Sequence, residues 1–232
     1  MVLEDRIEVR TPPQFDEAFI ADFLEDHEDW LKENTERQQS INEKHSRFLR
    51  RFSIANHGKV LLHGREIPVS IVRDKHTLNT ALSINRDGLS ITLNPVIDNN
   101  NALRLIKKLF KSEIKQYIVN DFSNILTFYS ERYGFHFNQV RIKNTRSRWG
   151  SCSGKRNINL HWKLVLMPEP VRDYVIVHEL CHLKHLDHSR QFWNTLASIV
   201  PDYKEQKRWL KEHQGVLKGY ELSKLPVIVP DP

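Results

Sequence analysis

Two histidines four residues apart constrain this chain more than any other feature. They are His178 and His182, which open and close the segment HELCH. On a helix, residues four apart lie about 40° apart around the axis, so both imidazoles face one direction. The same face carries the apolar residues Val171 and Val175, which turns the histidines toward the protein interior. Because an unligated pair of imidazoles would be costly to bury, the segment predicts a metal site on a core-facing helix.

Glu179 completes this HExxH pattern. Its side chain points in a neighbouring direction, close enough to reach a water on the metal without displacing the histidines. Zinc lowers the pKa of such a water to about 7, and a carboxylate can accept its proton as the water attacks a carbonyl or phosphoryl centre. Catalytic zinc sites have three protein ligands and one open position. We therefore expect Glu179 to be the general base, a third ligand outside the pair, and one Zn²⁺ per chain.

The charge of the chain is unevenly distributed. The 232 residues carry a net charge of +6. Residues 1–36 contain twelve Asp and Glu against three Lys and Arg, a charge of −9, so residues 37–232 carry +15. Such a basic part favours anionic partners, namely nucleic acid bound to the basic surface, nucleotides or acidic peptides.

The cysteines and the hydropathy pattern predict where the protein works. Cys152 and Cys181 lie inside motif-like sequence and not in a framework of paired spacings, which favours a reducing compartment. The sequence contains neither a secretory leader pattern nor an apolar run long enough to span a bilayer. We expect a cytoplasmic protein with no membrane partner.

Hydrophobic patterns predict two parts, an acidic and β-rich N-terminal region at residues 1–100 and a core at residues 101–232. In the first part we expect a short strand at residues 7–10, a helix from residue 16 to about 34, and several antiparallel strands between residues 59 and 97.

The second part begins with a long helix predicted for residues 99–133, which Gly134 ends. Strands at residues 140–142 and 158–165 follow, joined by the hairpin-like segment RSRWGSCSGKRN. Pro168 or Glu169 begins the HExxH helix, and Ser189 is the expected N-cap of a further helix to about Val200.

Several strings around the HExxH pattern resemble the YgjP-like metallopeptidase family. They are RWGSC, INL, VRDYVIVHELCHL and H..QFW, between residues 148 and 193. That family is related to the WLM and SprT-like zinc peptidases, whose members include proteases acting on DNA-linked proteins. The resemblance implies an α+β, zincin-like fold in which a mixed β-sheet packs on the metal-bearing HExxH helix. It also implies an edge strand, within residues 149–159, that holds an extended peptide.

The resemblance further implies His188 as the third metal ligand, and geometry separates it from His185. If the helix continued through His185, that imidazole would extend the row formed by His178 and His182 along one edge of the helix. A row of donors cannot surround a tetrahedral ion. His188 precedes the expected N-cap Ser189, where the chain turns, so its imidazole can approach from another direction. We therefore predict that the third ligand is His188.

Arg146, Arg148 and Trp149 are the candidate substrate-binding residues. The arginines belong to a basic cluster just ahead of the HExxH helix, where guanidinium groups can bind phosphates. A second basic set, which includes Lys107, Lys111 and Lys115, lies along one face of the long helix and is interpreted as a solvated face. We expect the aromatic residues Trp149, Phe192 and Trp193 to pack around the metal site.

Three functions follow from these features. The leading one is a zinc metallopeptidase in which Glu179 activates water and passes the proton to the leaving amine. The alternative is a metal-dependent nucleoside triphosphate pyrophosphohydrolase, in which the basic cluster neutralises the triphosphate. The third is a nucleic-acid-associated module whose zinc stabilises the fold, although a structural site has no use for a general base such as Glu179.

Overall fold

The computed structural model describes residues 16–145 and 147–230. Its contacts separate the chain into two compact units, Met1–Arg51 and Phe52–Pro232. The strand expected at residues 7–10 lies outside the described residues. The division into residues 1–100 and 101–232 stays a prediction about domains, but by contacts the β-rich segment belongs to the second unit.

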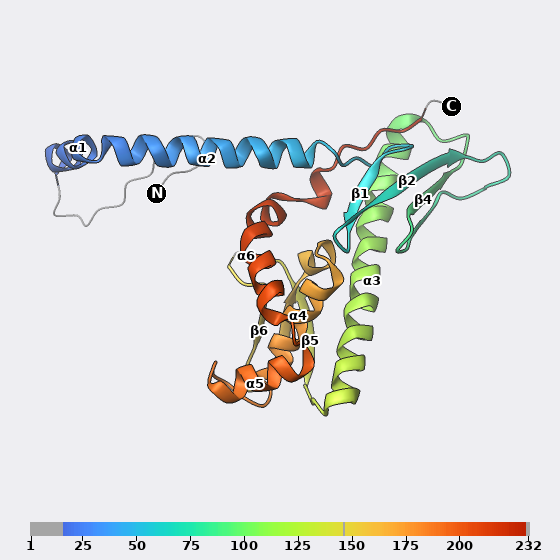
Figure 1. Ribbon diagram of the computed structural model, residues 1–232. Helices are drawn as coiled ribbons and strands as arrows, with labels where there is room; N and C mark the ends of the chain where they lie inside the picture. Colours follow the sequence, from blue (N-terminus) through green and yellow to red (C-terminus); the bar gives the residue numbers. More distant parts are fainter. Residues whose placement is uncertain (1–15, 146, 231–232) are drawn as a thin grey trace. The chain divides into compact units, whose positions relative to one another are not determined.

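The first unit contains two helices, α1 (Glu17–Asp26) and α2 (Glu28–Leu49) (Figure 1). Asp16 caps α1, since its side chain accepts a hydrogen bond from the backbone N–H of Phe19. A break at His27 separates the helices. The sequence-based expectation of a single helix ending near residue 34 is therefore wrong, because a second helix continues for 22 residues.

Four strands form the first sheet of the second unit, in the order β1-β2-β4-β3. Alternate residues of β2, namely Ile67, Val69 and Ile71, are buried, so one face of the sheet contributes to the core. The pairs β1–β2 and β3–β4 are antiparallel, but β2 and β4 run parallel, which corrects the expectation of antiparallel strands alone. The bounds are β1 Lys59–Leu62, β2 Arg65–Arg73, β3 Ala81–Ile84 and β4 Leu89–Leu93.

The long helix α3 (Asn99–Tyr133) confirms the sequence prediction. Asp98 caps its start by accepting a hydrogen bond from the backbone N–H of Asn101. Gly134, with a φ of 65°, ends it in the left-handed conformation that glycine adopts most easily. Buried side chains recur every four residues and form one stripe toward the core: Ala102, Ile106, Phe110, Ile114, Ile118, Phe122 and Leu126.

The second sheet has three strands in the order β5-β7-β6, so β6 is an edge strand. Its bounds are β5 Gln139–Lys143, β6 Gly150–Cys152 and β7 Asn157–His161. β7 runs parallel to β5 and antiparallel to β6, which makes the sheet mixed. The strand predicted to reach Val165 ends at His161, because the next residues form the 3-10 helix η1 (Trp162–Leu166).

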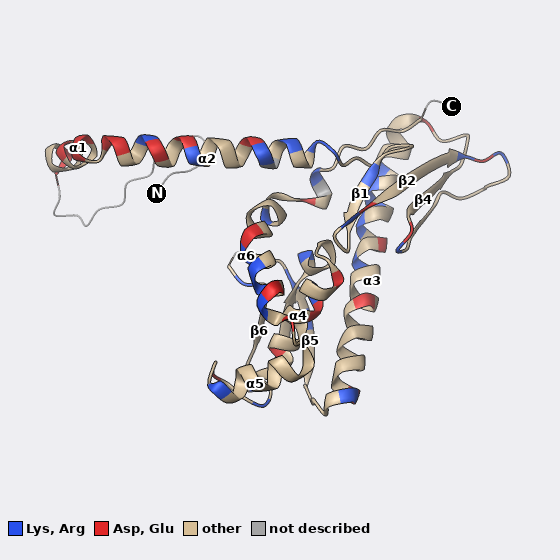
Figure 2. Ribbon diagram, in the orientation of Figure 1, with Lys and Arg blue, Asp and Glu red and all other residues tan. Residues whose placement is uncertain are grey.

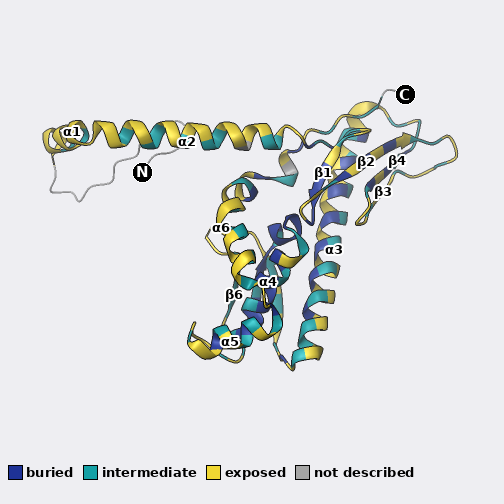
Figure 3. Cartoon of the chain, viewed as in Figure 1, coloured by how far each residue is buried: buried dark blue, intermediate teal, exposed yellow. Residues whose placement is uncertain are grey.

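The HExxH segment lies on α4 (Glu169–Cys181), which packs against β6, β7, α3, α5 and α6. Figure 3 shows α4 as mostly buried. The chain continues through α5 (Arg190–Ile199), α6 (Tyr203–Gly219) and the short η2 (Leu222–Lys224). A mixed sheet on the HExxH helix is the arrangement predicted from the sequence, and the α+β, zincin-like fold class is confirmed. None of the described helices is both long and apolar enough to cross a bilayer.

Candidate metal centre

Helix α4 positions two of the three predicted ligands. It begins at Glu169, with Pro168 at the N-cap as the sequence predicted. His182 is its C-cap, so His178 and His182 lie on the last turn of a helix fixed by core packing. Leu180 between them is fully buried and anchors that turn to the interior.

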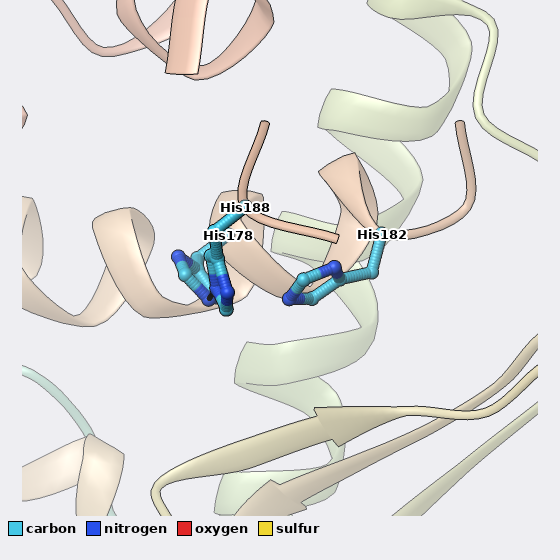
Figure 4. Close-up of side chains that lie close together, drawn as sticks. All are labelled: His178, His182 and His188. Atoms are coloured by element: carbon cyan, nitrogen blue, oxygen red, sulfur yellow. Dashed lines mark hydrogen bonds between the residues drawn. The ribbon is translucent and has the colours of Figure 1, made fainter. Parts of the chain in front are cut away.

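His188 reaches the same point from the loop between α4 and α5. One ring nitrogen each from His178, His182 and His188 lie within 4.8 Å of one another. The Nε2 atoms of His178 and His188 are 3.0 Å apart. Figure 4 shows the three rings close together, with His178 and His188 overlapping in this view and His182 facing them. The described structure does not place His185 in this cluster.

Phe192 on α5 forms the apolar floor beneath the histidines. Its ring centroid lies 4.9 Å from that of His178, 4.7 Å from that of His182 and 4.8 Å from that of His188. The side chain of Phe192 is fully buried, and Trp193 stacks on His188 at 5.6 Å. These contacts confirm the expected packing of Phe192 and Trp193, and they restrict the rotation of the three imidazoles.

Hydrogen bonds give His182 and His185 different roles. The Nδ1 of His182 lies 3.0 Å from the backbone carbonyl of His185, which can only accept, so Nδ1 donates this hydrogen bond and Nε2 is the atom left for a metal ion. The ring of His185 turns away, because its Nε2 lies 3.1 Å from the hydroxyl of Thr195 on α5.

The protonation state of His178 suits metal binding. Burial, helped by the nearby His182, His188 and Lys207, lowers the pKa of His178 to about 3. The ring is therefore neutral at physiological pH. Its Nδ1 is buried and has no hydrogen-bond partner among the described residues, while its Nε2 faces the other two histidines. A neutral imidazole offers the lone pair that a metal ion requires.

Glu179 is buried beside this cluster, with 6% of its surface exposed. Burial raises the pKa of its carboxyl group to about 8, and the positive charge of Arg148 opposes that rise. The carboxyl group lies against the backbone of Gly150 in the edge strand β6, where a Cβ atom would be 2.5 Å from its Oε1. Glu179, which follows His178 on α4, therefore has its carboxyl group against the edge strand.

The donor set fits a zinc ion. Two nitrogens bound to one tetrahedral ion at 2.0–2.1 Å are about 3.3 Å apart, close to the spacing of the His178 and His188 rings. Three imidazoles, two on α4 and one on the loop before α5, supply three ligands of a tetrahedral ion and leave the fourth position open. Exposure of His188 places that position at the surface.

Comparison with known proteins identifies the family of this chain. The family described as "YgjP-like, metallopeptidase domain" matches residues 1–213. The chain belongs to the YgjP-like metallopeptidase family. None of the curated proteins matches it significantly. Among solved structures it is similar to the crystal structure of the metallopeptidase zymogen of Pyrococcus abyssi abylysin, with 23% identity and a TM-score of 0.37 over 46% of this chain and 99% of that chain.

The three candidate substrate-binding residues of this YgjP-like protein differ from one another in their surroundings. Arg148 is exposed, and its charge acts on Glu179. The ring of Trp149 packs against His161 at 5.1 Å, and its roles beside the metal site and in substrate binding stay predictions. Arg146 lies outside the described residues.

Helix α6 adds two residues that the sequence analysis missed. Tyr203 stacks on Trp193 at 5.4 Å, and the ammonium of Lys207 lies 5.0 Å from the centre of the same indole ring. Lys207 lowers the pKa of both His178 and His188, so its positive charge acts on the metal centre of this YgjP-like metallopeptidase. The sequence offers little indication of this role, because Lys207 is one basic residue of an amphipathic segment that contains no motif.

Other residues near the motif have structural contacts instead. Cys181 is fully buried in α4, and Asp173 binds Arg172 and Tyr129. The hydroxyl of the buried Tyr220 accepts a hydrogen bond from the backbone N–H of Leu61.

Proposed function

We propose that this metallopeptidase is zinc-dependent, holds one Zn²⁺ per chain through His178, His182 and His188, and cleaves peptide bonds with Glu179 as general base. The observation that carries the proposal is the clustering of three histidines, together with the buried carboxyl group of Glu179, which follows His178 on α4 and contacts an edge strand. Zinc, when bound, acts as a Lewis acid toward water and the scissile carbonyl.

The residues of the chain perform the remaining steps. Glu179 accepts the proton of the attacking water and then donates it to the nitrogen of the leaving amine. Its burial keeps bulk water away from this transfer, and Gly150 leaves the carboxyl group room beside the strand. The positive charges of Arg148 and Lys207 stabilise the negative charge that develops on the substrate oxygen.

The edge strand β6 supports a peptide as the substrate. Its outer side has no strand partner within the described residues, and its residues Gly150, Ser151 and Cys152 are partly exposed. An extended peptide can add to such an edge through backbone hydrogen bonds, largely independent of its side chains. This places a scissile bond next to Glu179.

One observation favours the alternative, hydrolysis of nucleoside triphosphates. Arg148 is exposed beside Glu179, and a guanidinium group there can bind phosphate oxygens. We rank this function second because the described surroundings of the three histidines are mainly aromatic: Phe192, Trp193 and Tyr203.

The free thiols of Cys152 and Cys181 suit a reducing compartment, so we propose that the protein works in the cytoplasm.

A parallel screen distinguishes the two activities. The zinc-loaded protein is incubated with a peptide mixture and, separately, with nucleoside triphosphates; new amino termini and released pyrophosphate are measured. The same protein treated with a chelator is the control. We expect new amino termini that disappear on chelation. Metal-dependent pyrophosphate release without peptide cleavage would assign the site to the alternative.

A further inference from the structure

A groove of about 840 Å³ lies in the second unit, between α3, β5, η1 and the C-terminal segment. Its floor is apolar and includes Phe110, Ile114 and Leu225, all of which belong to the buried core. None of the three clustered histidines lines it. The groove is therefore a surface feature that the proposed peptidase chemistry does not use.

The rim of this groove is strongly basic. Glu221 is the single carboxylate among its lining residues, and it is paired with Lys224 at 3.2 Å. None of the lining lysines forms an ion pair with a described residue. Lys163 is 95% buried, and its ammonium donates to the backbone carbonyl of Lys218. Six lysines line the groove: Lys107, Lys111, Lys115, Lys143, Lys163 and Lys218.

An apolar floor under an unpaired basic rim suits an acidic amphipathic helix. Such a helix would place apolar side chains on the floor and carboxylates against the lysines, which is the usual manner in which a helix binds in a groove. Duplex nucleic acid would use the lysines through its phosphates but has no group that needs an aliphatic floor. The combined chemistry therefore favours an acidic helix.

The chain itself contains a helix of this chemistry. Residues 16–36 include nine Asp and Glu and one Lys, and Figure 2 shows the acidic residues along α1 and the start of α2. Phe23 and Trp30 are 48% and 55% exposed, and no residue of α1 is buried. Large exposed aromatic side chains on a charged helix are typical of a binding surface.

The length of α2 indicates whether the groove binds α1 of its own chain or α1 of a second copy of the protein. A helix of 22 residues is about 33 Å long, and it separates α1 from Phe52, where the second unit begins. Ile54, which lines the groove, follows Leu49, the last residue of α2, by only five positions in the sequence. We propose that the groove of one copy binds the acidic helix α1 of a second copy. When both copies exchange α1, the contact is closed and forms a symmetric dimer.

Charge exchange in the full-length protein tests this proposal. One variant reverses the rim (Lys107→Glu, Lys111→Glu, Lys115→Glu), and another reverses the helix (Glu17→Lys, Asp22→Lys, Glu25→Lys). Sedimentation equilibrium should show a dimer for the unchanged protein and self-association weakened roughly tenfold or more for each variant alone. An equimolar mixture of the two variants should form a heterodimer, because each helix then meets a rim of opposite charge.

A matched control has the same change of charge away from the groove: Lys108→Glu, Lys155→Glu and Lys211→Glu. This variant should dimerise like the unchanged protein. A monomeric unchanged protein at all accessible concentrations, or a mixture of the two variants that stays monomeric, would overturn the proposal. Loss of DNA binding in the rim variant without any self-association of the unchanged protein would overturn it in favour of nucleic acid.

Discussion

Gly150 lies directly against the side chain of Glu179. A Cβ atom at position 150 would be 2.5 Å from both Cγ and Oε1 of the glutamate, a distance that real Cβ atoms do not reach. The strand β6 and the helix α4 therefore approach each other at the one position where β6 has no side chain. This contact fixes the carboxyl group of Glu179 against the edge strand.

Gly150→Ala should reduce activity without removing the metal. The new methyl group displaces the carboxyl group of Glu179, and a shift of about 1 Å in a catalytic group can lower the rate on the order of 100-fold. Steady-state kinetics and metal analysis of the purified variant check this. Gly154→Ala is the matched control, since a Cβ there meets no atom within 4 Å. Equal activity of the two variants would show that the close contact has no catalytic consequence.

Arg148→Ala should move the acidic limb of the kcat/KM profile to higher pH. The positive charge of Arg148 lowers the pKa of Glu179, so its removal makes the carboxylate harder to form. A base is active only when ionised, and the variant therefore needs a higher pH to reach its maximum rate. Arg141→Ala on β5 is the control. An unshifted acidic limb in Arg148→Ala would argue against Glu179 as the titrating base.

His188→Ala should weaken zinc binding far more than His185→Ala does. His188 lies in the cluster, whereas the ring of His185 bonds Thr195 and only its carbonyl orients His182. Loss of an orienting contact typically costs roughly tenfold to hundredfold in affinity, and loss of a ligand costs more. Competition with a fluorescent chelator measures both affinities. The opposite order would place His185 in the ligand set.

In the metal-free protein, the stability that neutral His63 contributes should be lost as the pH falls from about 6.5 to about 4. Burial lowers the pKa of His63 to about 4, and its Nδ1 lies 2.9 Å from Arg172. The fold thus favours the neutral ring of His63. The contribution of this ring to the free energy of unfolding is complete above pH 6.5 and is lost on acidification. Urea unfolding with chelator across this range should show a shallower pH dependence for His63→Gln. The slope should not vanish, because the pKa of His161 is also lowered to about 4. Parallel curves for the two proteins would contradict this role of His63.

Local signals in the sequence located the elements that hold the site. Gly134 ends α3, Pro168 opens α4 and Ser189 caps α5 as predicted, because each residue has a conformational or hydrogen-bonding preference that acts within a few positions. The convergence of His188 with the helix histidines was predictable for the same reason, since it depends on a nearby turn.

The sequence did not predict the helical segments that bury few side chains. The C-terminal half of α2 consists mostly of polar residues, and its few apolar ones, such as Ile41 and Phe48, show no hydrophobic period from which a helix could be predicted. α6 has one buried residue, Leu217, and its approach to the metal centre through Tyr203 and Lys207 depends on tertiary packing. The parallel pairing of β2 with β4 is equally non-local.

The contact between Gly150 and Glu179 could not be predicted, although both residues belong to recognised strings. The strings RWGSC and HELCH start 30 positions apart, at Arg148 and His178, and no local rule relates a strand glycine to a helix carboxylate. Only the packing of β6 on α4 brings them together.

Glu179→Gln, with zinc content and peptide turnover measured on the same sample, tests the central claim most directly. Glutamine keeps the shape of the side chain beside Gly150 but cannot accept the proton of the attacking water. The account predicts about one zinc per chain, as in the unchanged protein, with hydrolysis reduced by at least the roughly 100-fold to 10,000-fold typical of general-base removal. Retained turnover, or zinc lost in proportion to activity, would contradict Glu179 as the base.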